Sequence, residues 1–458
     1  MRVIICGAGQ VGFSIASYLS RENNDVTVID TDAQMVAAVS EQLDVNAIQG
    51  HASSPDVLSA AGANEADLIV AVTHIDEINM VSCQVAHSLF NVPKKIARIR
   101  DRRYLNPAWA NLFSRAHMPI DVTISPEVEV AKALATRLSI PGTTNVIPLA
   151  GGSLYFCGVI CESDCPVINT PLRQLVELFP DVQMKLLAIS RDDKVIIPDA
   201  DDQMKVGDEV SFVANAAHLP RILTAFGHDE QKARSIVIMG GGNIGSCLVD
   251  ELQESGANLN IKIIEKDSSR ALKLSESFED LVILHGDGVD RQILEEADIS
   301  HTEALVAVTD DDEANILGSL LARHYGCGRT ITLVNRNTYS SLMAPLGLGA
   351  IVSPRAITVS TIMQHVRRGR IKAVHNVLDG EAEIIEAEAS EGTDIVNVPL
   401  RDLLLPRQVL IGAILRDDTV IIPKGDTIIR PGDHVIIMAT QGSSLKVEKM
   451  FSVQVNLF

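Results

Sequence analysis

The chain contains 458 residues, of which 46% are hydrophobic, 21% charged and only 3% aromatic, and its formal net charge at pH 7 is −20. That length suffices for about three domains, each with its own buried core. The negative charge disfavours general attraction to nucleic acid or anionic lipid, and the scarcity of aromatic residues argues against platforms on which bases stack.

The N-terminal stretch is the part of the chain that comes nearest to a targeting or membrane segment. Gly7, Gly9 and Gly12 interrupt it, and no small-residue cleavage site follows, so we interpret it as a strand and its turn. No run reaches the roughly 18–20 apolar residues of a membrane-spanning helix. Direct membrane insertion is therefore not expected. The seven cysteines are scattered and odd in number, which indicates the reducing cytosol.

The first part of the chain alternates short apolar runs with helix-length polar stretches. The predicted elements are strands at 3–7, 26–30, 46–50, 67–73 and 95–100, and helices at about 10–22, over the 30s, at 55–61 and at 76–90. Continuous apolar strands separated by helices predict a parallel sheet that is covered on both faces.

Three cysteines in the next segment are spaced like metal ligands on a helix. Cys157, Cys161 and Cys165 would share a helix face, but Gly158 interrupts a helix and no histidine lies between residues 117 and 218. We interpret the cysteines as small, half-buried strand residues, and we expect no metal site.

A second copy of the whole pattern follows the first. The matching pairs are GAGQVG at 7–12 with GGGNIG at 240–245, LIVAVTHIDEINM at 68–80 with ALVAVTDDDEANI at 304–316, and LLAISRDDKVIIP from 186 with LIGAILRDDTVIIP from 410. The chain is therefore a tandem duplication of a two-part unit. The predicted domains are 1–140, 141–228, 233–368 and 369–458. The first and third are predicted as Rossmann-like doubly wound parallel-sheet domains, and each is followed by a small α+β domain.

The small domains are predicted to be mostly short strands with one helix. Each contains an Arg-Asp-Asp triplet between two strand-like patterns. Because aspartate is a common turn residue, we interpret the triplets as hairpin turns rather than as catalytic dyads.

The glycine motif occurs each time in the context that binds a dinucleotide. Each copy follows a strand, opens a helix, and is followed about twenty residues later by an acid at the end of the next strand, Asp30 or Glu265. The first glycine permits a tight turn, the second lets a diphosphate approach the helix N-terminus, and the third lets the helix pack on the sheet. The acids favour NAD or an adenine nucleotide over NADP. The alternative is a purely structural turn without a ligand.

Further polar residues are expected at the same crevice. Thr73 and His74 end the fourth strand, and Thr309 and Asp310 end its copy. Three arginines at 98, 100 and 102 alternate along the next strand and would share one face, where they meet phosphates. The alternative, a solvated edge strand, applies to Arg102 and Arg103 more than to Arg98. Leu333 stands where Arg98 does in the first half. The two sites are therefore not equivalent, and the second binds a different nucleotide or none.

An oxidoreductase would need an acid or base beside the cofactor. The small domains share turn residues but no histidine, lysine or cysteine at matching positions, so hydride transfer is unsupported and no catalytic residue is assigned. An NAD-dependent oxidoreductase with duplicated Rossmann domains is kept as the alternative function. A third class, the soluble part of a potassium efflux or antiport system, would be expected as a single copy joined to membrane helices.

The combination of motifs resembles the TrkA family, the cytosolic nucleotide-binding regulatory subunits of bacterial Trk potassium-uptake systems. The resemblance covers essentially the whole chain. It rests on the VAVT strand end followed by Asp-Glu-x-Asn, on RIRDRRY and its copy VNRNTY, and on the small domain after each half. It implies tandem RCK (KTN) and TrkA-C domains. It further implies NAD or NADH with ATP or ADP as alternative occupants, and a ring, expected to be a tetramer, beneath a TrkH- or TrkG-type channel subunit. The implied location is cytoplasmic, peripheral on the inner membrane, with no nucleic-acid partner.

The same resemblance implies two nucleotide sites. The first would contain Gly7, Ala8, Gly9, Gln10, Val11, Asp30, Thr73, His74 and Arg98, and the second Gly240, Gly241, Gly242, Asn243, Ile244, Glu265 and Thr309. The family often has Gly-Asp-Ala after the third strand. The chain departs from this with Gly50-His51-Ala52 and Gly286-Asp287-Gly288, so the adenine-side contacts of the first site do not follow from the resemblance.

Overall fold

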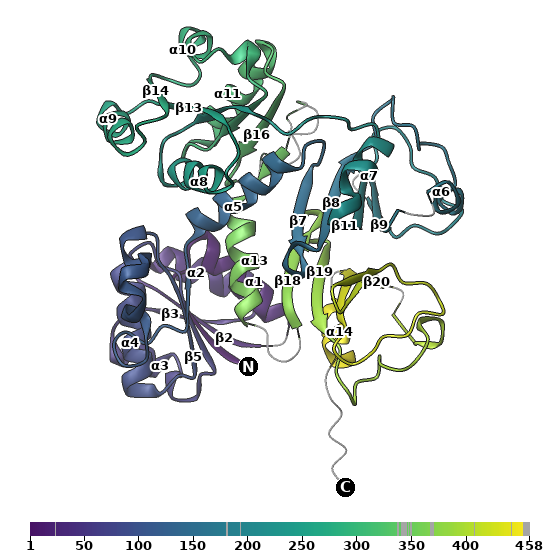
Figure 1. Ribbon diagram of the computed structural model, residues 1–458. Coiled ribbons are helices and arrows are strands. Elements are labelled where there is room, and N and C mark those ends of the chain that lie inside the picture. Colours follow the sequence, from purple (N-terminus) through teal and green to yellow (C-terminus); the bar gives the residue numbers. More distant parts are fainter. Residues whose placement is uncertain are drawn as a thin grey trace. The chain divides into compact units, whose positions relative to one another are not determined.

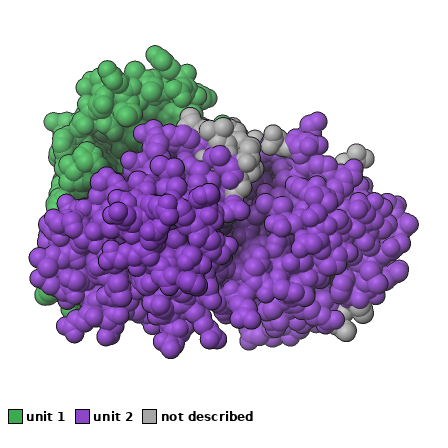
Figure 2. Space-filling model, turned by 90° about the horizontal axis from the view of Figure 1, so that it is seen from above, with its two compact units in different colours: residues 1–129, 355–368 green, residues 130–354, 369–458 purple. Residues whose placement is uncertain are grey.

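The computed structural model describes residues 1–22, 24–179, 182–192, 194–336, 339, 346, 348, 350–366, 371–406, 408–440 and 442–451. The chain divides into two compact units (Figure 2). One comprises Met1–Glu129 with Arg355–Arg368, and the other Val130–Pro354 with Gly369–Phe458.

The first unit contains a sheet of six parallel strands in the order β3-β2-β1-β4-β5-β6 (Figure 1). Its strands are β1 (Arg2–Cys6), β2 (Asp25–Asp30), β3 (Asn46–Gln49), β4 (Leu68–Ala71), β5 (Lys94–Arg98) and β6 (Val122–Ile124). Its helices include α1 (Gln10–Arg21), α2 (Ala33–Gln42), α3 (Pro55–Ala60) and α4 (Asp76–Phe90). The predicted Rossmann-like order is confirmed, and the strand order reverses between β1 and β4. That reversal is where ligands bind in open α/β sheets.

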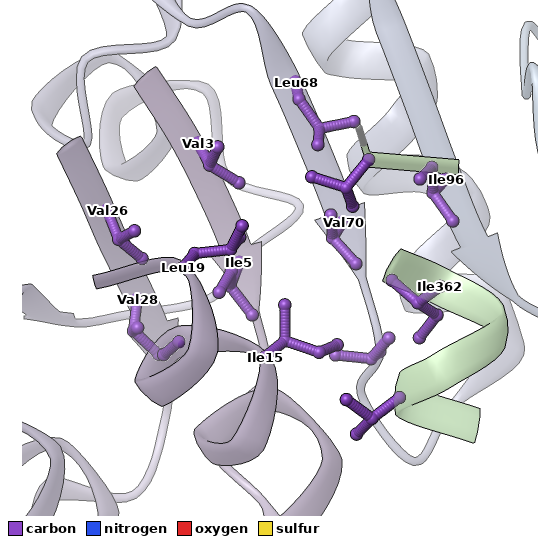
Figure 3. Close-up of a cluster of buried hydrophobic side chains, with 14 of the residues drawn as sticks. Val3, Ile5, Ile15, Leu19, Val26, Val28, Leu68, Val70, Ile96 and Ile362 are labelled. Carbon is purple, nitrogen blue, oxygen red and sulfur yellow. The ribbon is translucent and has the colours of Figure 1, made fainter. Parts of the chain in front are cut away.

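A helix from the second half of the sequence completes the core of this unit. The helix α13 (Pro354–Val366) follows the second large sheet in the chain, yet Ile362 lies in the same cluster as Ile15 and Leu19 of α1 and Val70 of β4 (Figure 3). All four side chains are at most 2% exposed. Hydrophobic burial therefore connects the two halves of the sequence within one core.

The second unit contains the other parallel sheet, in the matching order β14-β13-β12-β15-β16-β17. Its strands are β12 (Ser235–Met239), β13 (Asn260–Glu265), β14 (Val282–His285), β15 (Ala304–Ala307), β16 (Arg329–Leu333) and β17 (Ala350–Val352). Its helices include α8 (Asn243–Glu254), α9 (Ser268–Ser277), α10 (Arg291–Glu296) and α11 (Asp312–His324). Every parallel strand pair of the first sheet thus has a counterpart in the second.

The helix α5 (Pro126–Ser139) follows the first sheet in the chain but is bonded to the second. Arg137 on this helix donates to the main-chain oxygen of Ile351, and Arg329 Nη2 donates to the Leu138 oxygen at 3.0 Å. The helices α5 and α13 are therefore exchanged between the repeats.

The two small domains contain antiparallel sheets in the orders β10-β9-β11-β8-β7 and β18-β19-β22-β20-β21. The strands of the first are β7 (Asn145–Leu149), β8 (Leu154–Ile160), β9 (Met184–Arg191), β10 (Lys194–Ile196) and β11 (Glu209–Asn215), with helices α6 (Leu172–Leu178) and α7 (Leu219–Ala225). The strands of the second are β18 (Ile371–Val377), β19 (Ala382–Glu388), β20 (Val409–Arg416), β21 (Thr419–Ile421) and β22 (His434–Thr440), with helix α14 (Ser444–Met450).

The prediction of one helix in each small domain is wrong for the first of them. The TPLRQL segment opens α6, whereas its copy VPLRDL forms only a short 3-10 turn at Leu400–Asp402. Similar sequences therefore form elements of different length in the two copies.

The predicted hairpin turns are confirmed. The strands β9 and β10 pair antiparallel, as do β20 and β21. Arg191, the first residue of one triplet, holds the buried carboxylate of Asp208 through two bonds of 2.7 Å, and Arg416 holds Asp433 at 2.7–2.8 Å. Each pair ties the hairpin to the following Gly-Asp turn. Asp193, the last residue of the first triplet, lies outside the described residues.

The two small sheets share one hydrophobic cluster inside the second unit. Leu154, Phe156 and Leu187 of the first sheet lie in it with Ile384 and Met438 of the second, and each is at most 1% exposed. The small domains are therefore paired with one another through their sheet faces.

A buried carboxylate links the same two domains and should make the stability of the fold depend on pH. Glu386 Oε2 accepts the main-chain N–H of Ala150 at 2.8 Å, and the imidazoles of His375 and His434 lie 3.1 and 3.2 Å from its oxygens. Burial alone would raise the pKa of the Glu386 carboxyl. The bonds with the two imidazoles and with Ala150 nevertheless lower this pKa from 4.5 to about 2.

A carboxyl whose pKa is lower in the folded than in the unfolded state stabilises the fold at pH values above its unfolded-state pKa. That stabilisation is lost as the pH falls through the folded-state pKa. We expect the melting temperature of Glu386→Gln to fall less steeply than that of the wild type between pH 4.5 and about 2. Thermal unfolding across that range checks this, with exposed Glu391→Gln as the control. Parallel curves for Glu386→Gln and the wild type would contradict it.

Candidate nucleotide-binding sites

The glycine loops lie at the carboxyl ends of β1 and β12, beside the point where each strand order reverses. Gly7 has φ +110° and Gly240 has φ +107°, a region that side-chain-bearing residues rarely adopt. A Cβ at Gly7 would lie 3.1 Å from the Thr73 nitrogen, and one at Gly240 would lie 2.9 Å from the Thr309 nitrogen. Both features require glycine, as expected for the first residue of the motif.

The third glycine of each motif is required by helix packing. A Cβ at Gly12 would lie 1.8 Å from the Gly7 main-chain oxygen, and a Cβ at Gly245 would lie 2.1 Å from that of Gly240. A main-chain oxygen in a tight turn cannot rotate away from such a contact as a flexible side chain could. The start of each helix therefore stays against its turn only because these positions lack a side chain.

The second glycine of each motif faces open space. Gly9 and Gly242 are the N-cap residues of α1 and α8, and a Cβ at either would meet no atom of the described chain within 4 Å. Glycine has no side chain with which to cap the helix. The first-turn amides of Gln10, Val11, Asn243 and Ile244, with the positive end of the helix dipole, are thus placed to receive an anion.

The residues between these glycines differ between the halves. Ala8 is 2% exposed, so its methyl group fills space in the first turn. A Cβ at Gly241 would lie 2.2 Å from Leu274 Cδ1. The second turn therefore packs more closely on its neighbouring helix than the first.

The acids that end β2 and β13 hold the glycine loops through hydrogen bonds. Asp30 Oδ2 accepts the Ala8 N–H at 2.6 Å, and Glu265 Oε2 accepts the Gly241 N–H at 2.9 Å. The other oxygen of each accepts an amide two residues later, at 2.9 Å and 2.8 Å. Asp30 is half-buried whereas Glu265 is 5% exposed, so the Asp30 carboxylate is the more accessible to a ribose hydroxyl.

A buried asparagine joins the switch point to the neighbouring strand. Asn79 Oδ1 accepts from the Thr73 N–H at 2.9 Å and lies 2.7 Å from the Thr73 hydroxyl. Its Nδ2 donates to the main-chain oxygens of Thr73 and Arg98 at 3.1 and 2.9 Å. Asn315 makes the same four contacts with Thr309 and Leu333. The Asp-Glu-x-Asn repeat marks this hydrogen-bond network in the sequence, but the role of its asparagine was not predicted.

The aspartate of that repeat holds the segment after the fifth strand. Asp76 Oδ2 accepts the N–H groups of Arg100 and Asp101 at 2.9 and 2.8 Å. Asp312 accepts those of Asn335 and Arg336 at 2.9 Å. The repeat thus holds the main chain at the carboxyl ends of the fourth and fifth strands of both large sheets.

Arg98 is the cation that the first half brings to this edge of the sheet. It is half-buried at the end of β5, and its Nε atom is buried without a hydrogen-bond partner in the described chain. Burial lowers the pKa of its guanidinium. Such a cation is incompletely satisfied by the protein, so an anion next to it would be stabilised. Leu333, at the matching place in the second sheet, is 1% exposed.

The predicted row of arginines on one strand face is wrong. The strand β5 ends at Arg98, and Arg102 begins the 3-10 turn η2 (Arg102–Leu105). Arg100 lies beyond the strand and binds Glu127 at 2.8 Å. The alternative of a solvated edge strand is also wrong, because β5 lies between β4 and β6. The bonds of Asp76 to the main chain after Arg98 end the extended conformation.

The other two polar residues predicted for the switch point follow their strands directly. His74 and Asp310 are exposed and come immediately after Thr73 and Thr309. Both threonines pack against the glycine turns through their backbone. Each half therefore brings its predicted loop, acid and strand-end residues to a single crevice edge.

The cysteine prediction is only partly correct. Cys157 lies on β8, whereas Cys161 and Cys165 follow it, and all three are buried rather than half-buried, at most 3% exposed. Burial raises the pKa of the Cys161 thiol to about 12. Among the described residues no group of histidine, cysteine and acidic side chains could hold a metal ion.

Comparison with known proteins identifies the family. The TrkA-N domain matches residues 3–126 and 236–354, and the TrkA-C domain matches residues 159–227 and 384–452. The chain belongs to the TrkA family. It is 47% identical to the Trk system potassium uptake protein TrkA of Azorhizobium caulinodans over 458 residues, which is 100% of both chains. It is 37% identical to the TrkA of Halomonas elongata over 462 residues, again 100% of both.

Solved structures agree with this family at the level of the fold. The GsuK RCK domain matches with a TM-score of 0.59 and 17% identity, covering 98% of this TrkA-family chain and 94% of that chain. The GsuK channel bound to NAD matches with a TM-score of 0.58 and 17% identity, covering 98% and 78%. Within the part of the chain that the structure describes, no helix is long and apolar enough to cross a membrane.

Proposed function

We propose that this chain is the nucleotide-sensing regulatory subunit that gates a Trk-type potassium-uptake channel. The observation that carries the proposal is the pair of helix N-termini, each with a glycine cap facing open space beside an acid-held loop. The named relatives are potassium uptake proteins, and GsuK has been solved both with NAD and with ADP. NAD or NADH and the adenine nucleotides ATP and ADP are therefore the proposed ligands.

The proposed sites follow the sequence prediction. In the first crevice, the amides of Gly9, Gln10 and Val11 hold the diphosphate and Arg98 contributes a cation, while Thr73 and His74 line the switch point. In the second, Gly242, Asn243 and Ile244 play the amide role and Thr309 lines the switch point, without a counterpart of Arg98. Asp30 and Glu265 hold each loop in shape, and Asp30 is open to the ribose. The four domain boundaries predicted from the repeat are part of the same proposal.

Gating follows from differential binding. A ligand shifts a conformational equilibrium only if it binds one conformation better, and a tenfold preference at one site supplies about 1.4 kcal/mol. The chain carries two crevices, so a tetrameric ring would carry about eight sites and could add these increments. We propose such a ring on the cytoplasmic face of the inner membrane, bound to a TrkH- or TrkG-type channel subunit.

An NAD-dependent oxidoreductase is the competing function. Two polar residues near the switch point support the regulatory proposal instead, because Asn79 is bonded to the main chain and Asp76 Oδ2 accepts two main-chain N–H groups. An acid or base for hydride transfer needs a free proton-transfer position beside the nicotinamide. Steady turnover of NADH with a simple substrate would favour the enzyme.

A matched pair of glycine variants tests nucleotide binding. Gly9→Ala and Gly242→Ala each place a methyl group where a diphosphate would approach, so each should weaken binding at its own crevice by about tenfold or more. Neither methyl group meets protein atoms, so both variants should melt with the wild type. Calorimetric titration with NADH, ADP and ATP measures the affinities. Unchanged affinities in the double variant would contradict the proposed sites.

A further inference from the structure

The two crevices can be compared position by position because the same main-chain bonds build them. The Gly50 N–H donates to the Asp30 main-chain oxygen at 2.8 Å, and the Gly286 N–H donates to that of Glu265 at 2.9 Å. Together with the matched threonine and asparagine bonds described above, this fixes which side chains occupy equivalent places. His51 corresponds to Asp287, and His74 to Asp310.

The charges of the two crevices differ at the loop that follows the third strand of each large sheet. There His51 of the first crevice is replaced by Asp287 of the second, and Thr31 is replaced by Lys266. Lys266 Nζ lies 2.7 Å from Asp287 Oδ2, so these two charges offset one another. This edge of the second crevice is therefore close to neutral, and the cation there is already committed to an acid.

At the switch point the second crevice has two acids, and the nearby charge of Lys266 acts on one of them, Asp311. Asp310 and Asp311 follow Thr309 directly, where the first crevice has His74 and Ile75. Asp310 is exposed, and Asp311 caps α11 by accepting the Ala314 N–H at 2.9 Å. That amide bond lowers the pKa of the Asp311 carboxyl, so it stays ionised at neutral pH.

The cations of the second crevice do not replace the missing Arg98. Its place is taken by buried Leu333, and that of Arg100 by Asn335. The described cations near this edge are paired, Arg270 with Glu265 at 3.5 Å and Arg336 with Glu313 at 3.4 Å. The second crevice thus has two acids at its switch point and no counterpart of the desolvated Arg98 guanidinium.

We propose that Asp310 and Asp311 make the second crevice selective by charge: it rejects ATP and ADP, and it binds NAD⁺ in preference to NADH. This rests on the proposed function of the crevices as nucleotide sites. A dinucleotide crosses the sheet at the switch point, which places its nicotinamide half on the side of the fourth strand. The oxidised ring is cationic and the reduced ring is neutral, so an acid at that strand end stabilises only the oxidised form. A chain of phosphates at the same edge is repelled.

The test isolates each crevice in the full-length protein. Gly9→Ala weakens nucleotide binding at the first crevice and leaves the second unaltered, and Gly242→Ala does the reverse. In Gly9→Ala we expect NAD⁺ to bind about tenfold more tightly than NADH, and ATP to bind at least about tenfold more weakly than it binds to the first crevice in Gly242→Ala. Adding Asp310→Asn to Gly9→Ala should bring NAD⁺ and NADH together and strengthen ATP binding. Asp280→Asn, which removes an equal charge from an exposed loop before β14, should change neither.

Different results would contradict the charge selectivity of the second crevice and the proposed nucleotide-binding function. Equal affinities of NAD⁺ and NADH in Gly9→Ala, or ATP binding as tight as in the first crevice, would overturn the charge selectivity while leaving both crevices as nucleotide sites. Absence of nucleotide binding in the wild-type protein would overturn the proposed function itself, and the selectivity with it.

Discussion

Gly12→Ala should lower the free energy of unfolding by at least about 3 kcal/mol, because its methyl group would overlap the Gly7 main-chain oxygen at 1.8 Å. The helix can relieve this overlap only by moving away from β1, and that movement would open the core that Ile15 and Leu19 help to fill. The same shift would displace the first-turn amides, so nucleotide binding to the first crevice should be lost as well. Denaturant unfolding and calorimetric titration measure the two effects.

Gly9→Ala is the matched control, since it makes the same chemical change three residues earlier. Its methyl group would meet no described atom within 4 Å, and the φ of Gly9 is −63°, which alanine adopts readily. We expect wild-type stability with weakened nucleotide binding. If Gly12→Ala were as stable as Gly9→Ala, the close packing of α1 on its turn would be refuted.

Asn79→Ala should cost about 2 kcal/mol, because it leaves partly buried main-chain groups of Thr73 and Arg98 without their partner. Asn79 is fully buried, so water cannot replace the lost bonds without rearrangement. Loosening these strand ends should also weaken nucleotide binding at the first crevice. Thermal unfolding and titration with ADP measure both consequences.

Gln84→Ala tests the same helix at an accessible position. Within the described chain its amide bonds only to the exposed Ser88 hydroxyl, at 2.9 Å, so its loss should change stability by less than about 0.5 kcal/mol. Asn315→Ala should repeat the Asn79 result in the second repeat. Equal stability of the Asn79 and Gln84 variants would show that the amide network does not hold the strand ends.

The sequence predicted the large sheets well because their central strands, such as β1 and β4, are nearly continuous apolar runs, and such runs are buried on both faces. The register of GAGQVG with GGGNIG placed the glycines correctly at the turn and helix starts. The exchange of α5 and α13 could not be predicted, since a repeat shows which segments are alike and not which sheet each covers. Ile362 of α13 has the same apolar character whichever core it enters.

The structure brings the candidate glycine loops and acids to one edge of each sheet, but the bonds that the acids make were not predicted. Asp30 and Glu265 were assigned to the ribose, yet both carboxylates hold loop amides, a role that sequence spacing alone does not distinguish. The arginine row failed because Asp76 bends the main chain after β5. That bond joins residues that are far apart in sequence, so local alternation carried no sign of it.

The central claim is that nucleotides bound at the glycine crevices set potassium flux through a membrane partner. The most direct measurement is potassium flux into vesicles that contain a Trk-type channel subunit and this protein, with and without ATP, ADP, NAD⁺ or NADH. We expect flux to change with nucleotide in the wild-type protein and the change to disappear in the Gly9→Ala/Gly242→Ala double variant, which still binds the channel subunit. Flux that ignores every nucleotide, or that responds equally in the double variant, would contradict the claim.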